Sequence, residues 1–285
     1  GLVQGWQYND NFQLDFSIDR SHTFRDPGGQ AFNSNAALSS GTVTDDFTAA
    51  SVGANYVEDT WSSSSRAEYR TSDADIQRSL FIGYFREQNT GFGMSLDMQV
   101  FDTDRRSGSD ETLAEINYSV AYRPDSSAWT ILNRFDLEYD SANSDDSSIR
   151  TRKAVNNLNL NYTVDGKHQF GAHWGIKYTL DNIDNEEYDG VTQLLGFQYL
   201  YDLHKRVDLS LHGDVLYSSN TDNYRYSLGP AIGLNVFKNM WLSVGYNIDG
   251  FEDEDFSAAE YTANGPYVKM RFKFDKSTVK GLLNR

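Results

Sequence analysis

From residue 12 to residue 274 the sequence repeats one pattern: about fourteen runs of roughly ten residues in which apolar and polar side chains alternate. The last run shows the pattern most clearly, because Val268 and Met270 alternate with Lys269 and Arg271. Successive side chains of a β-strand point to opposite faces. Each run therefore predicts a strand with one apolar face and one polar face.

The spacers between the runs show a second regularity, because short and long ones alternate. Short spacers lie near residues 58–59, 88–89, 124–126, 165–166, 203–204 and 237–239, and longer ones at 20–45, 71–74, 103–110, 141–151, 181–190, 218–222 and 250–260. A soluble β-sandwich gives no reason for this alternation, whereas a transmembrane barrel has short periplasmic turns and long outer loops. The sequence therefore predicts an all-β fold, a transmembrane antiparallel up-and-down β-barrel of about 14 strands.

The predicted strands can be placed one by one. They are 12–18, 50–56, 61–69, 76–84, 92–100, 114–122, 129–139, 158–164, 170–180, 191–201, 207–217, 224–236, 240–248 and 268–274. An even number is usual in bacterial single-chain barrels, and it would leave both termini in the periplasm. We expect residues 1–274 to form an outer-membrane barrel and residues 275–285 to form a periplasmic tail.

Composition narrows the class of protein further. The chain has 285 residues, a net charge of −16 and no cysteine, which leaves no disulfide framework and no thiolate metal site. Mean hydropathy is −0.61, and no stretch of 18 apolar residues predicts a transmembrane helix. The acidic balance argues against nucleic acid, which requires clustered Lys and Arg. The expected location is the bacterial outer membrane.

The register opposite the apolar one predicts the side chains that line the lumen. These candidate pore-lining residues are Arg66, Glu68, Arg70, Glu115, Arg123, Arg134, Asp136, Glu138, His173, Lys177, Asp208, His212, Asp214, Arg225, Lys269 and Arg271. In a dry core so many charges would each cost several kcal/mol unless paired. They indicate a water-filled pore, or else a lumen occluded by cross-strand ion pairs and a folded-in loop.

The width of the lumen depends on the number of strands and on the size of the side chains that point inward. Barrels of eight strands just fill with side chains, while porins of sixteen leave a channel. Seven glycines are expected to face inward and to remove bulk from the later strands: Gly171, Gly175, Gly196, Gly213, Gly229, Gly233 and Gly245. About fourteen strands should therefore be wide enough for a lumen.

The sequence also contains residues that could form a metal site or a catalytic site. The acidic segments 181–189 and 252–255 offer oxygen ligands for calcium or magnesium, but neither has EF-hand spacing, so we predict no metal site and no cofactor. Ser210, His212 and Asp214 form a conceivable catalytic set in one register. They are spaced about 7 Å apart per step along a single strand, beyond hydrogen-bond reach, so we predict no catalytic residues and no enzyme.

Several segments resemble a known family. The segments 46–56, 66–70, 155–162, 241–247 and 256–267 resemble the barrel domain that ends large repeat-containing surface proteins of Gram-negative bacteria. This resemblance implies that the barrel anchors or exports something attached on its N-terminal side. The closing strand also resembles the assembly signal of outer-membrane proteins, but residues 275–285 follow it where many such proteins stop.

The leading functional hypothesis is a monomeric barrel that forms a porin-like passive passage for small hydrophilic solutes. The alternative is a membrane anchor or translocator with an occluded lumen, and a third hypothesis is a surface adhesin or phage receptor that uses its long loops. Expected partners are outer-membrane lipid and lipopolysaccharide, the barrel-assembly machinery and an upstream or partner protein.

Overall fold

The computed structural model describes residues 1–22, 46–88, 91–237, 240–250, 255–256 and 264–272. The strands are β1 (Leu2–Gln7), β2 (Phe12–Ser21), β3 (Phe47–Val57), β4 (Trp61–Ser72), β5 (Asp75–Gln88), β6 (Phe92–Arg105), β7 (Ser109–Tyr122), β8 (Trp129–Asn143), β9 (Ser148–Thr163), β10 (His168–Ile183), β11 (Glu186–His204), β12 (Val207–Ser218), β13 (Asn223–Phe237), β14 (Met240–Asn247) and β15 (Gly265–Phe272). No helix among these described residues is long and apolar enough to cross a membrane.

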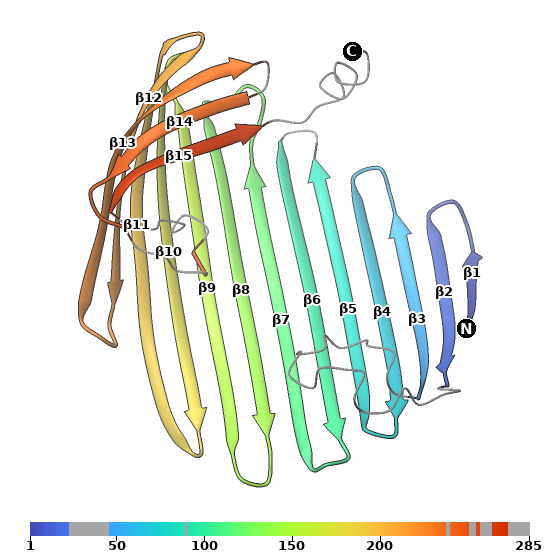
Figure 1. Cartoon of the computed structure of the whole chain (residues 1–285). Coiled ribbons are helices and arrows are strands. Elements are labelled where there is room, and N and C mark those ends of the chain that lie inside the picture. The colour runs from blue at the N-terminus through green and yellow to red at the C-terminus, as the bar shows by residue number, and fades with distance from the viewer. Residues whose placement is uncertain (23–45, 89–90, 238–239, 251–254, 257–263, 273–285) are drawn as a thin grey trace.

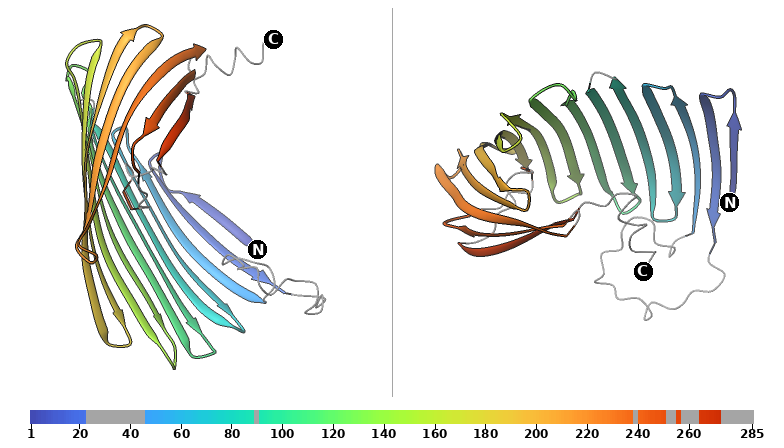
Figure 2. Two further views of the ribbon diagram at one scale, coloured as in Figure 1. Left: turned by 60° about the vertical axis from the view of Figure 1, so that its left-hand side comes forward. Right: turned by 90° about the horizontal axis from the view of Figure 1, so that it is seen from above.

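All fifteen strands form one sheet in which each strand pairs antiparallel with its neighbours in the sequence (Figure 1). The sheet is curved, and its C-terminal strands bend back over the concave face (Figure 2). Within the described part of the chain, β1 and β15 pair on one side only and form the two edges. The architecture is therefore all-β, antiparallel and up-and-down, as the alternation predicts.

Every predicted strand has a counterpart, from β2 to β15, and one strand was missed. The missed strand is β1, which pairs with β2 from Leu2↔Ile18 to Gln7↔Gln13. Its six residues are all exposed, and the run is short with Gly5 inside it, so its alternation is weak. The count of fifteen corrects the parity argument for the termini, because the start of β1 and the end of β15 lie at opposite rims. Residues 275–285, the predicted tail, lie outside the described residues.

The strands are longer than the sequence predicts, and the connections are correspondingly shorter. Predicted loops 103–110, 141–151 and 181–190 contract to connections at 106–108, 144–147 and 184–185. At the last of these, Asp184 and Asn185 both have positive φ, which suits a two-residue hairpin turn. The expected alternation of long and short loops is therefore mostly wrong in the described part. Polar residues at strand ends extend the ladder, because backbone pairing does not require an apolar side chain.

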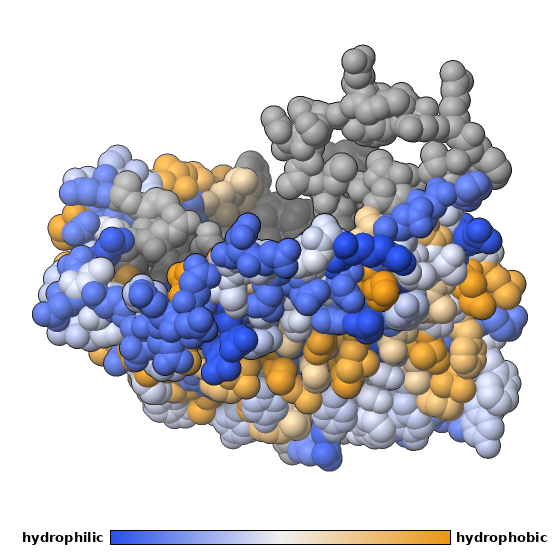
Figure 3. All heavy atoms as spheres, turned by 90° about the horizontal axis from the view of Figure 1, so that it is seen from below, coloured by the Kyte–Doolittle hydropathy of each residue, from blue (hydrophilic) through white to orange (hydrophobic). Residues whose placement is uncertain are grey.

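The two faces of the sheet differ as the registers predict. Exposed large apolar side chains gather on the convex face, and Figure 3 shows them along that side while hydrophilic residues cover much of the near rim. Leu195, Val268 and Met270 are 62%, 67% and 66% exposed there. The apolar surface thus lies outside the sheet, where a membrane protein contacts lipid.

Candidate functional site

The predicted pore-lining charges lie on the concave face, where many of them pair. Arg134 Nε lies 2.7 Å from Asp136 Oδ1, and Arg66 lies 3.1 Å from Glu68. Both pairs join residues two apart in one strand, which share a face. The mixed charge of the lumen register is thus partly neutralised by neighbours, as the occluded alternative expects.

Other predicted residues are placed as follows. Glu115 accepts a hydrogen bond from Gln99, and the guanidinium of Arg70 lies 4.3 Å from the ring of Phe47. The register places four further members on the same face as these contacts: Asp208, His212, Arg225 and Lys269. Arg123 follows the end of β7 and lies in the connection to β8, so the strand register does not place it in the lumen. The side chain of Arg271 lies outside the described residues.

A segment that sequence reasoning did not place in the lumen is the main feature of this face. Asp255 and Phe256 belong to the connection between β14 and β15, and both fold onto the wall formed by β9 to β12. Asp255 accepts hydrogen bonds from Lys153 at 2.9 Å and from Lys177 at 3.0 Å. Its carbonyl oxygen accepts a third from Asn157 Nδ2 at 3.1 Å. We call this pair of residues the latch.

The aromatic half of the latch is buried more completely than almost any other side chain. Phe256 is 1% exposed and forms one cluster with Val155, Leu194 and Leu216. A Cβ at Gly175 would lie 2.5 Å from the Cδ1 of Phe256, so the ring occupies the space that this glycine leaves. The latch therefore packs on an apolar patch, formed by Val155, Leu194 and Leu216, within an otherwise polar face.

The electrostatic half of the latch is a small network. Lys153 bridges Glu138 and Asp255, each at 2.9 Å, and Lys177 lies 5.4 Å from the centre of the Phe256 ring. Burial opposes the ionisation of Asp255, but the hydrogen bonds and charges of Lys153 and Lys177 outweigh burial and hold its pKa below the ordinary value. The carboxylate is thus charged near neutral pH.

The sequence did contain a signal for the apolar patch under Phe256. Val155, Leu194 and Leu216 are apolar residues in the register that is otherwise polar, and they lie on neighbouring strands. Asp255 was predicted only to lie in an acidic segment without a metal site, because the register of a strand says nothing about a segment more than 70 residues away. In the structure this acid is paired with two lysines and is 27% exposed.

Next to the latch the concave face is hollowed by a cavity of about 560 Å³. Charged residues of its lining are Glu115, Arg134, Asp136, Glu138, Lys153 and Asp255, and amides are supplied by Asn117, Asn157 and Asn159. Phe85 and Leu132 add an apolar part to the wall. The lining carries four carboxylates and two cations, and Lys177 beside it also pairs with Asp255, so the cavity offers many hydrogen-bonding groups with a small net negative charge.

The glycines of the later strands do not simply widen the lumen. A Cβ at Gly196 would lie within 2.2 Å of both His173 and Asp214, and at Gly233 within 2.6 Å of the Asp208 carboxylate. Large polar side chains of adjacent strands thus fill the space. Gly213 was assigned to the wrong face, since it lies opposite Phe197 on the apolar register.

The candidate catalytic set does not assemble. Asp214 Oδ1 lies 2.9 Å from His173 Nε2, and its Oδ2 accepts a 2.6 Å hydrogen bond from Ser227. The carboxylate thus lies between the hydroxyl and the imidazole, so this arrangement does not place a base next to a nucleophile. Among the described residues no group of three or more His, Asp or Glu side chains is placed to hold a metal ion.

Comparisons with known proteins identify the fold. No family model and no curated protein matches the sequence. The siderophore receptor PirA from Pseudomonas aeruginosa matches 96% of the chain at 8% identity with a TM-score of 0.53, and PirA from Acinetobacter baumannii matches 83% at 8% identity with 0.54. The chain spans 53% and 42% of those receptors. At this identity the likeness concerns the fold alone: the curved up-and-down sheet has the fold of an outer-membrane β-barrel wall.

Proposed function

We propose that this chain forms a bacterial outer-membrane β-barrel that acts as a passive passage for small hydrophilic solutes. The observation that carries the proposal is the pairing of an exposed apolar convex face with a concave face that holds a polar cavity of about 560 Å³. Lipid outside and water inside account for both faces. The latch lies beside the cavity and narrows the passage.

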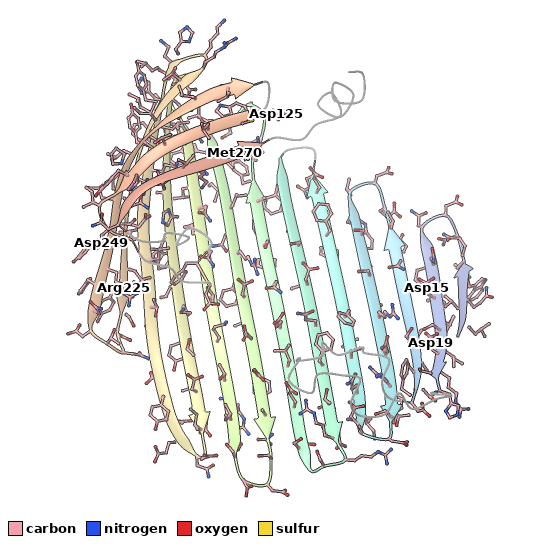
Figure 4. The ribbon with its side chains drawn as sticks, in the orientation of Figure 1. Asp15, Asp19, Asp125, Arg225, Asp249 and Met270 are labelled. Carbon is pink, nitrogen blue, oxygen red and sulfur yellow. The ribbon has the colours of Figure 1, made fainter. Side chains whose placement is uncertain are left out.

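The passage requires a closed wall, because unpaired backbone groups at a sheet edge cost several kcal/mol each in hydrocarbon. The inner register of β2 carries Asp15 and Asp19, and that of β15 carries Lys269. Figure 4 shows Asp15 and Asp19 at one edge of the sheet and Met270 on β15 at the other. β1 occupies the outer side of β2, and β2 and β15 run in opposite directions. Closure by an antiparallel pair of β2 and β15, with opposite charges on one face, therefore requires β1 to leave β2.

The solutes that suit this lumen are small, hydrophilic and close to neutral. Each lysine at the latch is matched by a carboxylate, and Arg134 is matched by Asp136. Paired charges leave amide and carboxylate groups to bind hydroxyl-rich solutes, while they provide little selection by ion sign.

A planar lipid bilayer recording tests the passage. The purified chain should produce discrete conductance steps, and these should be insensitive to the sign of the permeant ion within about a factor of three. Complete absence of steps from correctly inserted protein would refute the passage.

The second candidate is a membrane anchor or translocator with an occluded lumen. The latch favours it, because a segment with three hydrogen bonds and a buried aromatic ring can close a passage as well as narrow it. The resemblance to barrel domains of large surface proteins points to the same role. In this case wild-type protein is silent and only latch variants conduct, so the same recording separates the two functions.

A further inference from the structure

The convex face carries an apolar groove that the passage does not use. Its volume is about 220 Å³, and its lining comes from β7 to β10: Ala114, Ile116, Leu137, Tyr139, Arg152, Ala154 and Tyr178, with Glu138 and Lys153 completing it. Strand pairing puts Tyr139 opposite Ala114 and Arg152, and Tyr178 opposite Ala154, so these side chains share the convex face. The two small alanines leave a depression between the two tyrosine rings.

Arginines stand at the rim side of this groove. Arg152 is exposed, and no hydrogen bond or ion pair to it occurs within the described part of the chain. Arg150 follows on the same face two residues nearer the rim, and its Nε is enclosed without a hydrogen-bond partner. A cation that faces lipid near the end of an apolar band is stabilised by phosphate headgroups, at about 1 kcal/mol for each Lys or Arg.

Another arginine on the convex face is neutralised by a carboxylate of the protein itself. Arg78 lies on the same face of β5, and its Nη1 lies 2.6 Å from Asp102 Oδ2 on β6. Arg152 has no such carboxylate among the residues directly opposite it, which are Tyr139 and Leu180. Within the described part of the chain no carboxylate pairs with Arg152, so its charge is open to a phosphate headgroup.

We propose that this groove is a binding site for one phospholipid, with an acyl chain between Tyr139 and Tyr178 and the headgroup phosphate on Arg152. The groove is a single depression, which suits one acyl chain rather than the several chains of a lipopolysaccharide. Two tyrosines at its sides match the preference of such rings for the headgroup level. The site rests on the membrane location of the proposed function but not on an open passage.

The test is lipid retention by the purified protein in detergent, measured by native mass spectrometry with added phosphatidylglycerol. Wild-type protein should retain one lipid, and Arg152→Gln should raise the apparent dissociation constant for that lipid about fivefold, the factor that about 1 kcal/mol represents. Ala154→Trp fills the groove and should abolish retention. Arg78→Gln, which removes an outward arginine that already has a partner, is the matched control and should retain lipid as wild type does.

Equal retention by all four proteins would overturn the site, and so would displacement of phosphatidylglycerol by equimolar lipopolysaccharide. Neither readout depends on conductance. A silent channel that retains one lipid in an Arg152-dependent manner would therefore refute the passage and support the groove, whereas conductance without specific retention would do the reverse.

Discussion

Removing the aromatic half of the latch should release it from the wall. Phe256 is 1% exposed, and its ring packs on Val155, Leu194 and Leu216. Burying a Phe side chain contributes about 1.5–3 kcal/mol, so Phe256→Ala should lower the ratio of docked to undocked latch about 10- to 150-fold. The remaining contacts of the latch are the hydrogen bonds of Asp255 with Lys153, Lys177 and Asn157, and water can replace these partners when the latch leaves.

The assay is single-channel recording, in which the expected result is a larger or more frequent open level than wild type shows. Gly175→Val disrupts the same contact from β10, because its Cβ would lie 2.5 Å from the Phe256 ring. It should therefore give the same increase in the open level. Gly171→Ala is the matched control on the same strand and face, where a Cβ meets the flexible Asn161 side chain at 3.2 Å.

The reasoning would be refuted if Phe256→Ala and Gly175→Val inserted normally and gave current distributions identical to wild type. Heat-modifiable migration on a gel separates this outcome from failed folding, because a variant that inserts normally keeps its compact band. A similar effect from Gly171→Ala would also contradict the argument, since it would show that any bulk on this face alters conductance.

Three further predictions concern the latch charge, the closing edge and the lipid face. The pKa of Asp255 is lowered in the folded state, so its ionised form stabilises the docked latch fully above the ordinary value of 3.8, and this stabilisation is lost as pH falls through the lowered pKa. Wild-type conductance should therefore rise in acid, and Asp255→Asn should remove that pH dependence. A protein carrying Asp15→Cys and Lys269→Cys should form an intramolecular disulfide under oxidation if β15 takes the place of β1 beside β2, and unreacted thiols in inserted protein would exclude that exchange. On the convex face Leu195→Arg should cost about 2–4 kcal/mol and impair insertion, whereas Asn159→Arg on the concave face should insert normally; the opposite ranking in a liposome folding assay would invert the assigned faces.

The alternation of the strands predicted most of the wall, and the reason is local. Side-chain direction in a strand depends on position alone, so Val268 and Met270 were assigned outward from the sequence and are among the most exposed apolar residues. The strand ends were less well predicted, because polar residues such as Asp181 continue the ladder and the turn begins only at Asp184. β1 was missed for the opposite reason, since six residues with an internal glycine carry too little pattern.

The sequence by itself determined the fold class, the two faces and the charged character of the inner one, because all of these follow from a period of two. Only the tertiary structure decided how that inner face is used. The latch joins residues separated by up to 102 positions, and Asp214 of β12 pairs with His173 of β10, which lies two strands away. Such contacts depend on which strands the curvature brings together and on where Gly175 leaves room for a ring, neither of which a local pattern specifies.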